Sequence, residues 1–139
     1  MRPPDETQRP ATLDAALALT ALTGLANLVV GGAILTSLLV GALPNRPGLS
    51  SATLLTGAVT YLLLGTLTVA GAYGLFAGKA GSRVFVTVVM MLRMAVAGIS
   101  VGVIGTWYAA GSVIGLVVAF VVVALLWDSR ANAYFQEHR

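Results

Sequence analysis

Long apolar runs, separated by short polar breaks, make up most of the sequence. Four runs are apparent, at about residues 13–43, 52–77, 84–108 and 112–133. A helix of roughly twenty apolar residues crosses the hydrocarbon of a bilayer, and each run reaches that length. A membrane-spanning strand would alternate polar and apolar residues, and these runs do not alternate. The pattern therefore predicts an all-α membrane protein with four transmembrane helices.

The breaks between the runs contain residues that are typical of turns. They read LPNRPGLSS at 43–51, AGKAGSR at 77–83 and WYAAGS at 107–112. Proline, glycine and asparagine mark turns and loops, and short connections make neighbouring helices antiparallel. We therefore expect an up-down bundle that forms a single domain over residues 12–139. The polar, proline-rich residues 1–11 are expected to form a disordered cytoplasmic tail.

The distribution of cations between the breaks predicts the orientation of the bundle. The order of the runs leaves Arg46 as the one cation on one side of the membrane. The other side carries Arg2, Arg9, Lys79, Arg83, Arg130 and Arg139. Because cytoplasmic loops carry the excess of Lys and Arg, both termini are expected in the cytoplasm. The predicted location is the cell membrane, which the chain crosses several times.

The composition agrees with a membrane protein and excludes other classes. The 139 residues are 58% hydrophobic and 9% charged, with a mean hydropathy of +0.91, whereas a soluble domain carries about 25% charged residues. The net charge of +3 comes from cations in the breaks. Nucleic-acid binding needs a basic patch on a folded surface, so no nucleic-acid partner is expected. The preference for Arg over Lys is typical of a GC-rich prokaryotic genome.

Residues suited to catalysis or metal binding are scarce. The sequence has no cysteine, and its one histidine, His138, is the penultimate residue. No His/Glu set has metal-ligand spacing, and the glycines are not followed by the GK[ST] sequence of a phosphate-binding loop. We therefore expect no metal, no cofactor and no enzymatic activity.

One charged residue, Arg93, lies inside the third run, in the stretch VVMMLRMAVAG at 88–98. An arginine in hydrocarbon is costly and indicates a site of functional or structural importance. If the last turn is centred near Ala110, residues equally distant from it lie level with one another. This geometry places Arg93 beside Asp128 and predicts an ion pair between them across the last hairpin.

The depth of this pair can be predicted by counting along the helices. Arg93 lies about 21 Å from Trp107 at 1.5 Å per residue, which places it near the cytoplasmic edge of the hydrocarbon. The same counting puts Asn27 of the first run and Thr68 of the second at this level. Asn27, Thr68, Arg93 and Asp128 are therefore expected to form a polar layer.

Small residues recur at helical spacing and predict where helices touch. They are Gly24 and Gly31 in the first run, Gly57 and Gly71 in the second, and Gly98, Gly102 and Gly105 in the third. Glycines four residues apart allow membrane helices to approach closely. The glycines of the third run lie roughly opposite Arg93 around the helix. If Arg93 faces the bundle, they are available to another subunit; the alternative is that they pack against the fourth helix.

These patterns favour a small, non-enzymatic membrane subunit that forms a homo-oligomer or joins a larger membrane-protein partner in the lipid bilayer. Here the Arg93–Asp128 pair would close the last hairpin. The alternative is a small transporter or channel with a polar site that includes Asn27, Arg93 and Asp128.

Overall fold

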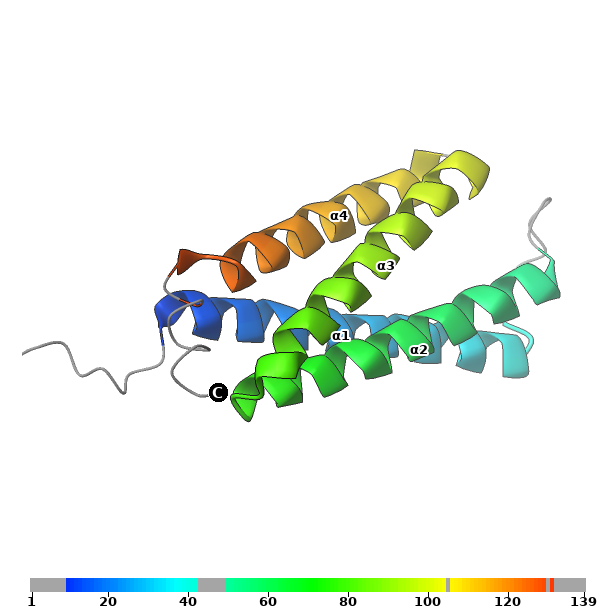
Figure 1. The fold of residues 1–139 in the computed structure, drawn as a ribbon. Helices are drawn as coiled ribbons and strands as arrows, with labels where there is room; N and C mark the ends of the chain where they lie inside the picture. The colour runs from blue at the N-terminus through cyan, green and yellow to red at the C-terminus, as the bar shows by residue number, and fades with distance from the viewer. Residues whose placement is uncertain (1–9, 43–49, 105, 130, 132–139) are drawn as a thin grey trace, which may run out of the picture.

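A computed structural model of the chain describes residues 10–42, 50–104, 106–129 and 131, and the surroundings of all their side chains except those of 80 and 98–112. The described residues form four helices: α1 (Ala11–Leu39), α2 (Ser51–Phe76), α3 (Ala80–Ile104) and α4 (Thr106–Leu126). Each helix runs antiparallel to the one before it (Figure 1). The prediction of an all-helical chain with four helices is confirmed for this part of the molecule.

The last hairpin differs from its prediction. The segment WYAAGS at 107–112, expected to be the turn, lies at the start of α4, because α3 ends at Ile104 and α4 begins at Thr106. Ala109 and Ala110 are strong helix formers, and glycine is tolerated within membrane helices. At its other end, α4 stops at Leu126, short of the predicted residue 133.

Glycines in the left-handed conformation end α1 and α2. Gly41 has φ 67° and Gly78 has φ 69°, a region that glycine enters without steric cost. The backbone N–H of Ala42 donates to the Ser37 carbonyl at 3.0 Å, and that of Lys79 donates to the Gly74 carbonyl at 3.2 Å. These are the bonds of a Schellman motif, and they fix where each hairpin turns.

Close backbone contact joins α1 to α2. A Cβ added to Gly24 would stand 2.7 Å from Val69 Cγ2 and 3.2 Å from the carbonyl oxygen of Gly65. A Cβ added to Gly31 would stand 3.1 Å from the carbonyl oxygen of Ala58. Glycine is needed here because a larger residue would hold the two helices apart. Gly24 and Gly31 thus lie at a helix contact, and Gly65 belongs to the same contact although the sequence prediction omitted it.

The α2–α3 contact also depends on glycine. A Cβ on Gly71 would stand 2.6 Å from Val86 Cγ2, and one on Gly74 would stand 2.7 Å from Ser82 Cβ. Gly57 was expected at a helix contact, but no described atom lies within 4 Å of its Cβ position. The predicted contacts of three further glycines lie outside the described side chains: Gly98, Gly102 and Gly105.

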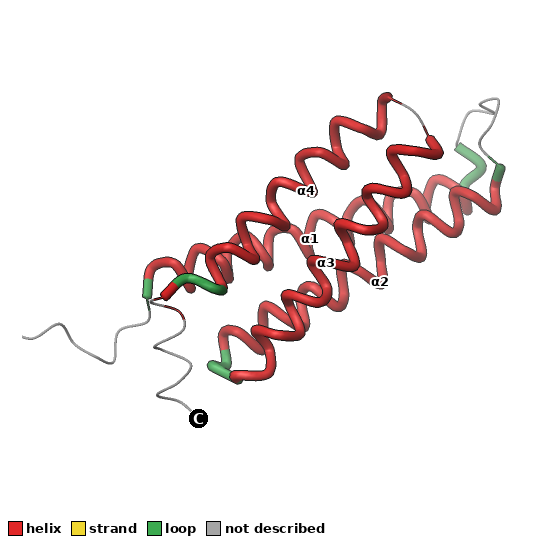
Figure 2. The backbone as a smooth tube through the Cα atoms, turned by 45° about the horizontal axis from the view of Figure 1, so that its top comes forward, coloured by secondary structure: helices red, strands yellow, loops and turns green. Residues whose placement is uncertain are grey.

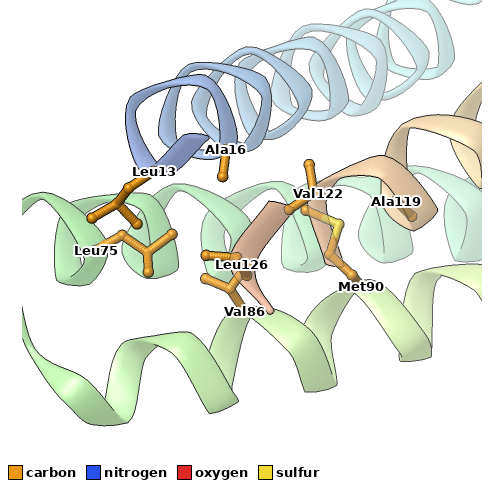
Figure 3. Packing of buried hydrophobic residues seen from close by; sticks show 8 residues of the cluster. All are labelled: Leu13, Ala16, Leu75, Val86, Met90, Ala119, Val122 and Leu126. Carbon is orange, nitrogen blue, oxygen red and sulfur yellow. The ribbon is translucent and has the colours of Figure 1, made fainter. Parts of the chain in front are cut away.

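The buried apolar core lies at the end of the bundle where α1 begins and α4 ends (Figure 3). It takes residues from all four helices: Leu13, Ala16, Leu75, Val86, Met90, Ala119, Val122 and Leu126. This cluster holds the α1–α2 hairpin to the α3–α4 hairpin. Toward the other end the hairpins diverge, so that the end of α3 and the start of α4 stand away from the far ends of α1 and α2 (Figures 1 and 2).

Most of the apolar surface of α1 and α2 faces outward. Both helices are long and apolar enough to cross a membrane, yet only 22% and 28% of their most apolar windows are buried within the chain. In α4, Val113–Leu126 forms a shorter apolar helix. Among the described residues, two helices are therefore long and apolar enough to span a membrane.

Candidate functional site

Arg93 follows Leu92, the middle residue of α3, and is half-buried. Its guanidinium lies against α4: a Cβ added to Gly115 would stand 3.5 Å from Nη2 and 3.8 Å from Nε. The Nη1 atom is buried and has no hydrogen-bond partner among the described residues. A buried charged donor without an acceptor is costly, so an added acceptor would stabilise this guanidinium.

The level of Arg93 on α2 follows from the α2–α3 contact. Gly71 faces Val86, and counting the same distance along both antiparallel helices puts Leu64 level with Arg93. Tyr61, less than one turn further along α2, is half-buried and close enough to Arg93 to act on it electrostatically. Tyr61 therefore lies near the level of Arg93, on the side of α2.

Asn27 reaches the same level from α1. Because Gly24 contacts Gly65 and Gly31 contacts Ala58, Asn27 lies near the level of Leu64, as Arg93 does. Asn27 is 4% exposed and lies on the buried side of α1. The predicted layer that joins Asn27 to Arg93 stays a prediction.

Thr68 has a structural role that needs no partner on another helix. Its hydroxyl donates to the carbonyl of Leu64 in its own helix at 2.6 Å, and the buried hydroxyl of Thr20 donates to Ala16 at 2.6 Å. A hydroxyl bonded in this way is satisfied within its helix. Thr68 therefore packs between helices and does not extend the polar group around Arg93.

The predicted ion pair between Arg93 and Asp128 does not form. Arg93 lies against Gly115, and α4 runs about 16 Å further from Gly115 to Leu126 at 1.5 Å per residue before the chain reaches Asp128. The cause is the earlier turn: because α4 begins at Thr106, each residue of α3 lies level with an earlier residue of α4 than predicted. Asp128 is therefore outside the polar layer.

A second polar cluster lies at the end of the bundle that contains the core. The guanidinium carbon of Arg83 lies over the ring of Trp127, 4.1 Å from its centroid. The indole Nε1 of Trp127 donates to Thr87 Oγ1 at 3.1 Å, and Thr87 in turn donates to the Arg83 carbonyl at 2.8 Å. Cation–π stacking and the hydrogen bonds together fix the end of α4 on the start of α3. The sequence analysis missed this cluster because it placed the last turn near Ala110, which puts the end of the fourth run level with Arg93 and not with Arg83.

The described residues offer little for catalysis or metal binding. No group of three or more His, Asp or Glu side chains among them is arranged to hold a metal ion. The distinctive chemical feature is instead a fixed cation between apolar helices, with a phenol and an amide at its level. Such a group binds an anion or a carboxylate through charge-assisted hydrogen bonds.

Comparisons with known proteins give no family. No protein-family model, no curated protein and no solved structure matches this chain.

Proposed function

We propose that this chain is a four-span membrane protein with cytoplasmic termini that acts as a non-enzymatic subunit of a membrane assembly. The length and exposure of α1 and α2 support membrane insertion. α3 has 25 residues and α4 has 21, enough at about 1.5 Å per residue to cross roughly 30 Å of hydrocarbon. The cations near the start of α3 favour a cytoplasmic position for that end.

The cluster of Arg83 and Trp127 suits the boundary between hydrocarbon and headgroups. Tryptophan is enriched at this level, and arginine near a helix end is tolerated there. From Arg83 to Arg93 is about 15 Å along α3, half the thickness of a typical hydrocarbon core. With Arg83 at the boundary, Arg93 lies near the bilayer midplane, deeper than the sequence predicted.

The observation that carries the proposed role is the state of Arg93. Its Nη1 is buried without a hydrogen-bond partner among the described residues, and its side chain is too short to reach either boundary from the midplane. A charge at this depth is paired in stable membrane proteins. A group from outside the described chain would therefore stabilise Arg93, which is the expected property of an assembly subunit.

Anion transport is the second candidate function. Counting along the helices puts Tyr61 on α2 and Asn27 on α1 near the level of Arg93, so three polar residues occur at about one depth. Arginine stays protonated in proteins, so it would act as an anion site and not as a proton carrier. Liposomes loaded with chloride or phosphate test this function: an anion flux that Arg93→Ala abolishes would favour transport over assembly.

Labelling of single cysteines tests the membrane topology. The chain has no native cysteine, so each introduced thiol is unique. A membrane-impermeant maleimide applied to intact cells should modify Ser50→Cys, at the start of α2, and should spare Lys79→Cys, at the start of α3. In inside-out vesicles the result should reverse. Equal labelling of both sites from one side would refute the four-span arrangement.

The mass of the native particle tests the assembly role. The chain has a mass of 14.2 kDa. Native mass spectrometry after mild-detergent extraction should find it in a particle of fixed stoichiometry that is heavier than one chain. A monomer that catalyses no anion flux would contradict both functions.

A further inference from the structure

We infer that the partner is a different protein, one of whose membrane helices carries an aspartate or glutamate near its middle that pairs with Arg93. The inference rests on the proposed function, because it specifies the chemistry of the partner in that assembly. It follows from the positions of the acidic residues in this chain and from the surface that surrounds Arg93.

All five acidic residues of the chain belong to its two ends. They are Asp5, Glu6, Asp14, Asp128 and Glu137. Asp14 lies in the first turn of α1, and Asp128 lies beyond the end of α4. These two helix ends come together at the core end of the bundle (Figure 1), at the level of the Arg83–Trp127 stack. Asp14 and Asp128 are thus about 20 Å along the bundle from Arg93, at 1.5 Å per residue.

A second copy of this chain cannot supply the missing carboxylate at the depth of Arg93. A parallel copy has Asp14 and Asp128 at the same boundary as the first copy, and the other three acidic residues precede α1 or follow α4 in the sequence. An inverted copy has Asp14 and Asp128 at the opposite boundary, which is about as far from the midplane. In both cases the apolar middles of the helices would meet, with one unpaired arginine from each copy. A homo-oligomer therefore leaves the charge of Arg93 uncompensated, and a different molecule is required.

The surface beside Arg93 suits an apolar helix that carries one acid. Large apolar side chains next to it on α3 and around Gly115 on α4 are exposed: Met91, Leu92, Ile114 and Val117. Arg93 is only half-buried, so a partner helix that covers these residues would bring its carboxylate to the exposed part of the side chain. Arginine and a carboxylate form paired, charge-assisted hydrogen bonds, and each charge in hydrocarbon is strongly favoured by the other. A small anion would compensate the charge of Arg93 but would not cover the exposed apolar side chains around it.

Designed peptides test the chemistry of the partner directly. The probe is a Leu/Ala membrane-spanning peptide with Lys flanks and a central Asp, and the control peptide has Asn at the same position. The protein carries one fluorophore at Ser50→Cys, which is exposed, and energy transfer to labelled peptide is measured in phosphatidylcholine vesicles. Wild-type protein should bind the Asp peptide roughly tenfold more tightly than the Asn peptide.

Two variants of Arg93 connect this preference to the guanidinium. Arg93→Leu should bind both peptides equally, and Arg93→Lys, which keeps the charge but loses the planar fork, should keep part of the preference. The thermal midpoint of each variant in detergent identifies any that fail to fold, and Arg93→Lys is the variant expected to fold as the wild type does. Equal binding of both peptides by the wild type, or an undiminished preference in Arg93→Leu, would overturn the inference.

Vesicles that contain anionic lipid distinguish a helix from a lipid headgroup. If phosphatidylglycerol or added phosphate removes the preference for the Asp peptide by competition at Arg93, an anion is the better ligand and the inference is overturned. A preference that persists in such vesicles supports a helical carboxylate.

The native particle separates this inference from the proposed function. A particle made only of multiples of 14.2 kDa would leave the assembly role standing and would overturn the acidic partner. A monomer would refute the assembly role itself. A particle with a second protein supports the inference when it contains a helix with a central acid and when Arg93→Leu, but not Arg93→Lys, releases that protein.

Discussion

The guanidinium of Arg93 lies against the backbone of α4 at Gly115, where a Cβ would stand 3.5 Å from Nη2 and 3.8 Å from Nε. Both distances are ordinary van der Waals contacts, so a methyl group fits beside the guanidinium. A larger side chain would occupy the space of the guanidinium itself. A small residue at this position therefore leaves room for a long cationic side chain between two apolar helices.

This contact predicts different effects for two substitutions of Gly115. Gly115→Ala should retain the wild-type preference for the Asp peptide and should fold at least as stably, since alanine favours the helix by up to about 1 kcal/mol. Gly115→Leu should displace the guanidinium and reduce the preference toward that of Arg93→Leu. Energy transfer in vesicles measures the preference. If Gly115→Leu bound the two peptides as the wild type does, the guanidinium would not depend on this contact.

The separation of Arg93 from Asp128 predicts that Asp128→Asn is nearly silent. Substitutions away from specific interactions change stability by less than about 0.5 kcal/mol, and Asp128 lies beyond the end of α4, whereas Gly115 lies near its middle. Breaking a buried ion pair would cost about 3–5 kcal/mol. SDS-driven unfolding in mixed micelles, followed by circular dichroism, measures the difference. A loss of several kcal/mol in the free energy of unfolding would show that Asp128 forms the ion pair that the sequence suggested.

The predicted and the observed pairing of α3 with α4 differ, and this difference shows what the sequence could specify. Apolar runs set the number of helices, and the proline- and glycine-containing breaks located the ends of α1 and α2 within a few residues. The last turn was misplaced because Gly111 and Ser112, beside two aromatic residues, are a stronger turn signal than Gly105 alone. In an antiparallel hairpin, moving the turn by about five residues changes which residue of the second helix lies opposite each residue of the first. The change is about ten residues, or about 15 Å along the helix.

The candidate site was therefore predicted in part. Arg93 was recognisable as a lone charge in an apolar run, and Asn27 was placed at its level by counting. Tyr61 was not singled out, because a tyrosine in an apolar helix gives no signal of its own until the packing of α2 on α3 is known. Contacts between helices depend on which faces meet, and the nearly uniform apolar surface of these helices does not specify that.

The contact between Gly24 and Gly65 predicts that the stability of the fold depends strongly on residue size at Gly65 and does not at Gly57. A Cβ on Gly65 would stand 3.0 Å from the carbonyl oxygen of Gly24, whereas no described atom lies within 4 Å of a Cβ on Gly57. Gly65→Ala should therefore destabilise the fold by about 1–3 kcal/mol, as overpacking does. Gly57→Ala, the matched control on the same helix, should be neutral or stabilising by up to about 1 kcal/mol.

Unfolding in mixed micelles compares the two alanine variants directly. The expected order of stability is Gly57→Ala, wild type and then Gly65→Ala. If both variants were equally stable, α1 and α2 would have room to separate at Gly24, and the close backbone contact would not contribute to the stability of the hairpin.

The hydrogen bond from Trp127 to Thr87 predicts energetic coupling between the end of α4 and the start of α3. Trp127→Phe removes the indole donor and keeps a ring over Arg83, and Thr87→Val removes the acceptor. Each change should cost about 1 kcal/mol, the usual net value of one hydrogen bond. The double variant should lose little more than one single variant, because both remove the same 3.1 Å bond.

The matched control for this cycle is Thr87→Ser, which keeps the hydroxyl and should retain most of the coupling. Trp127→Leu also removes the stacking on Arg83, so it should cost about 0.5–1 kcal/mol more than Trp127→Phe if the stack contributes as exposed cation–π pairs do. Circular dichroism during SDS-driven unfolding suits all these variants, because it does not depend on the tryptophan that is replaced. Strictly additive losses in the double variant would mean that the bond does not join the two helices, and that another contact holds α4 at this end.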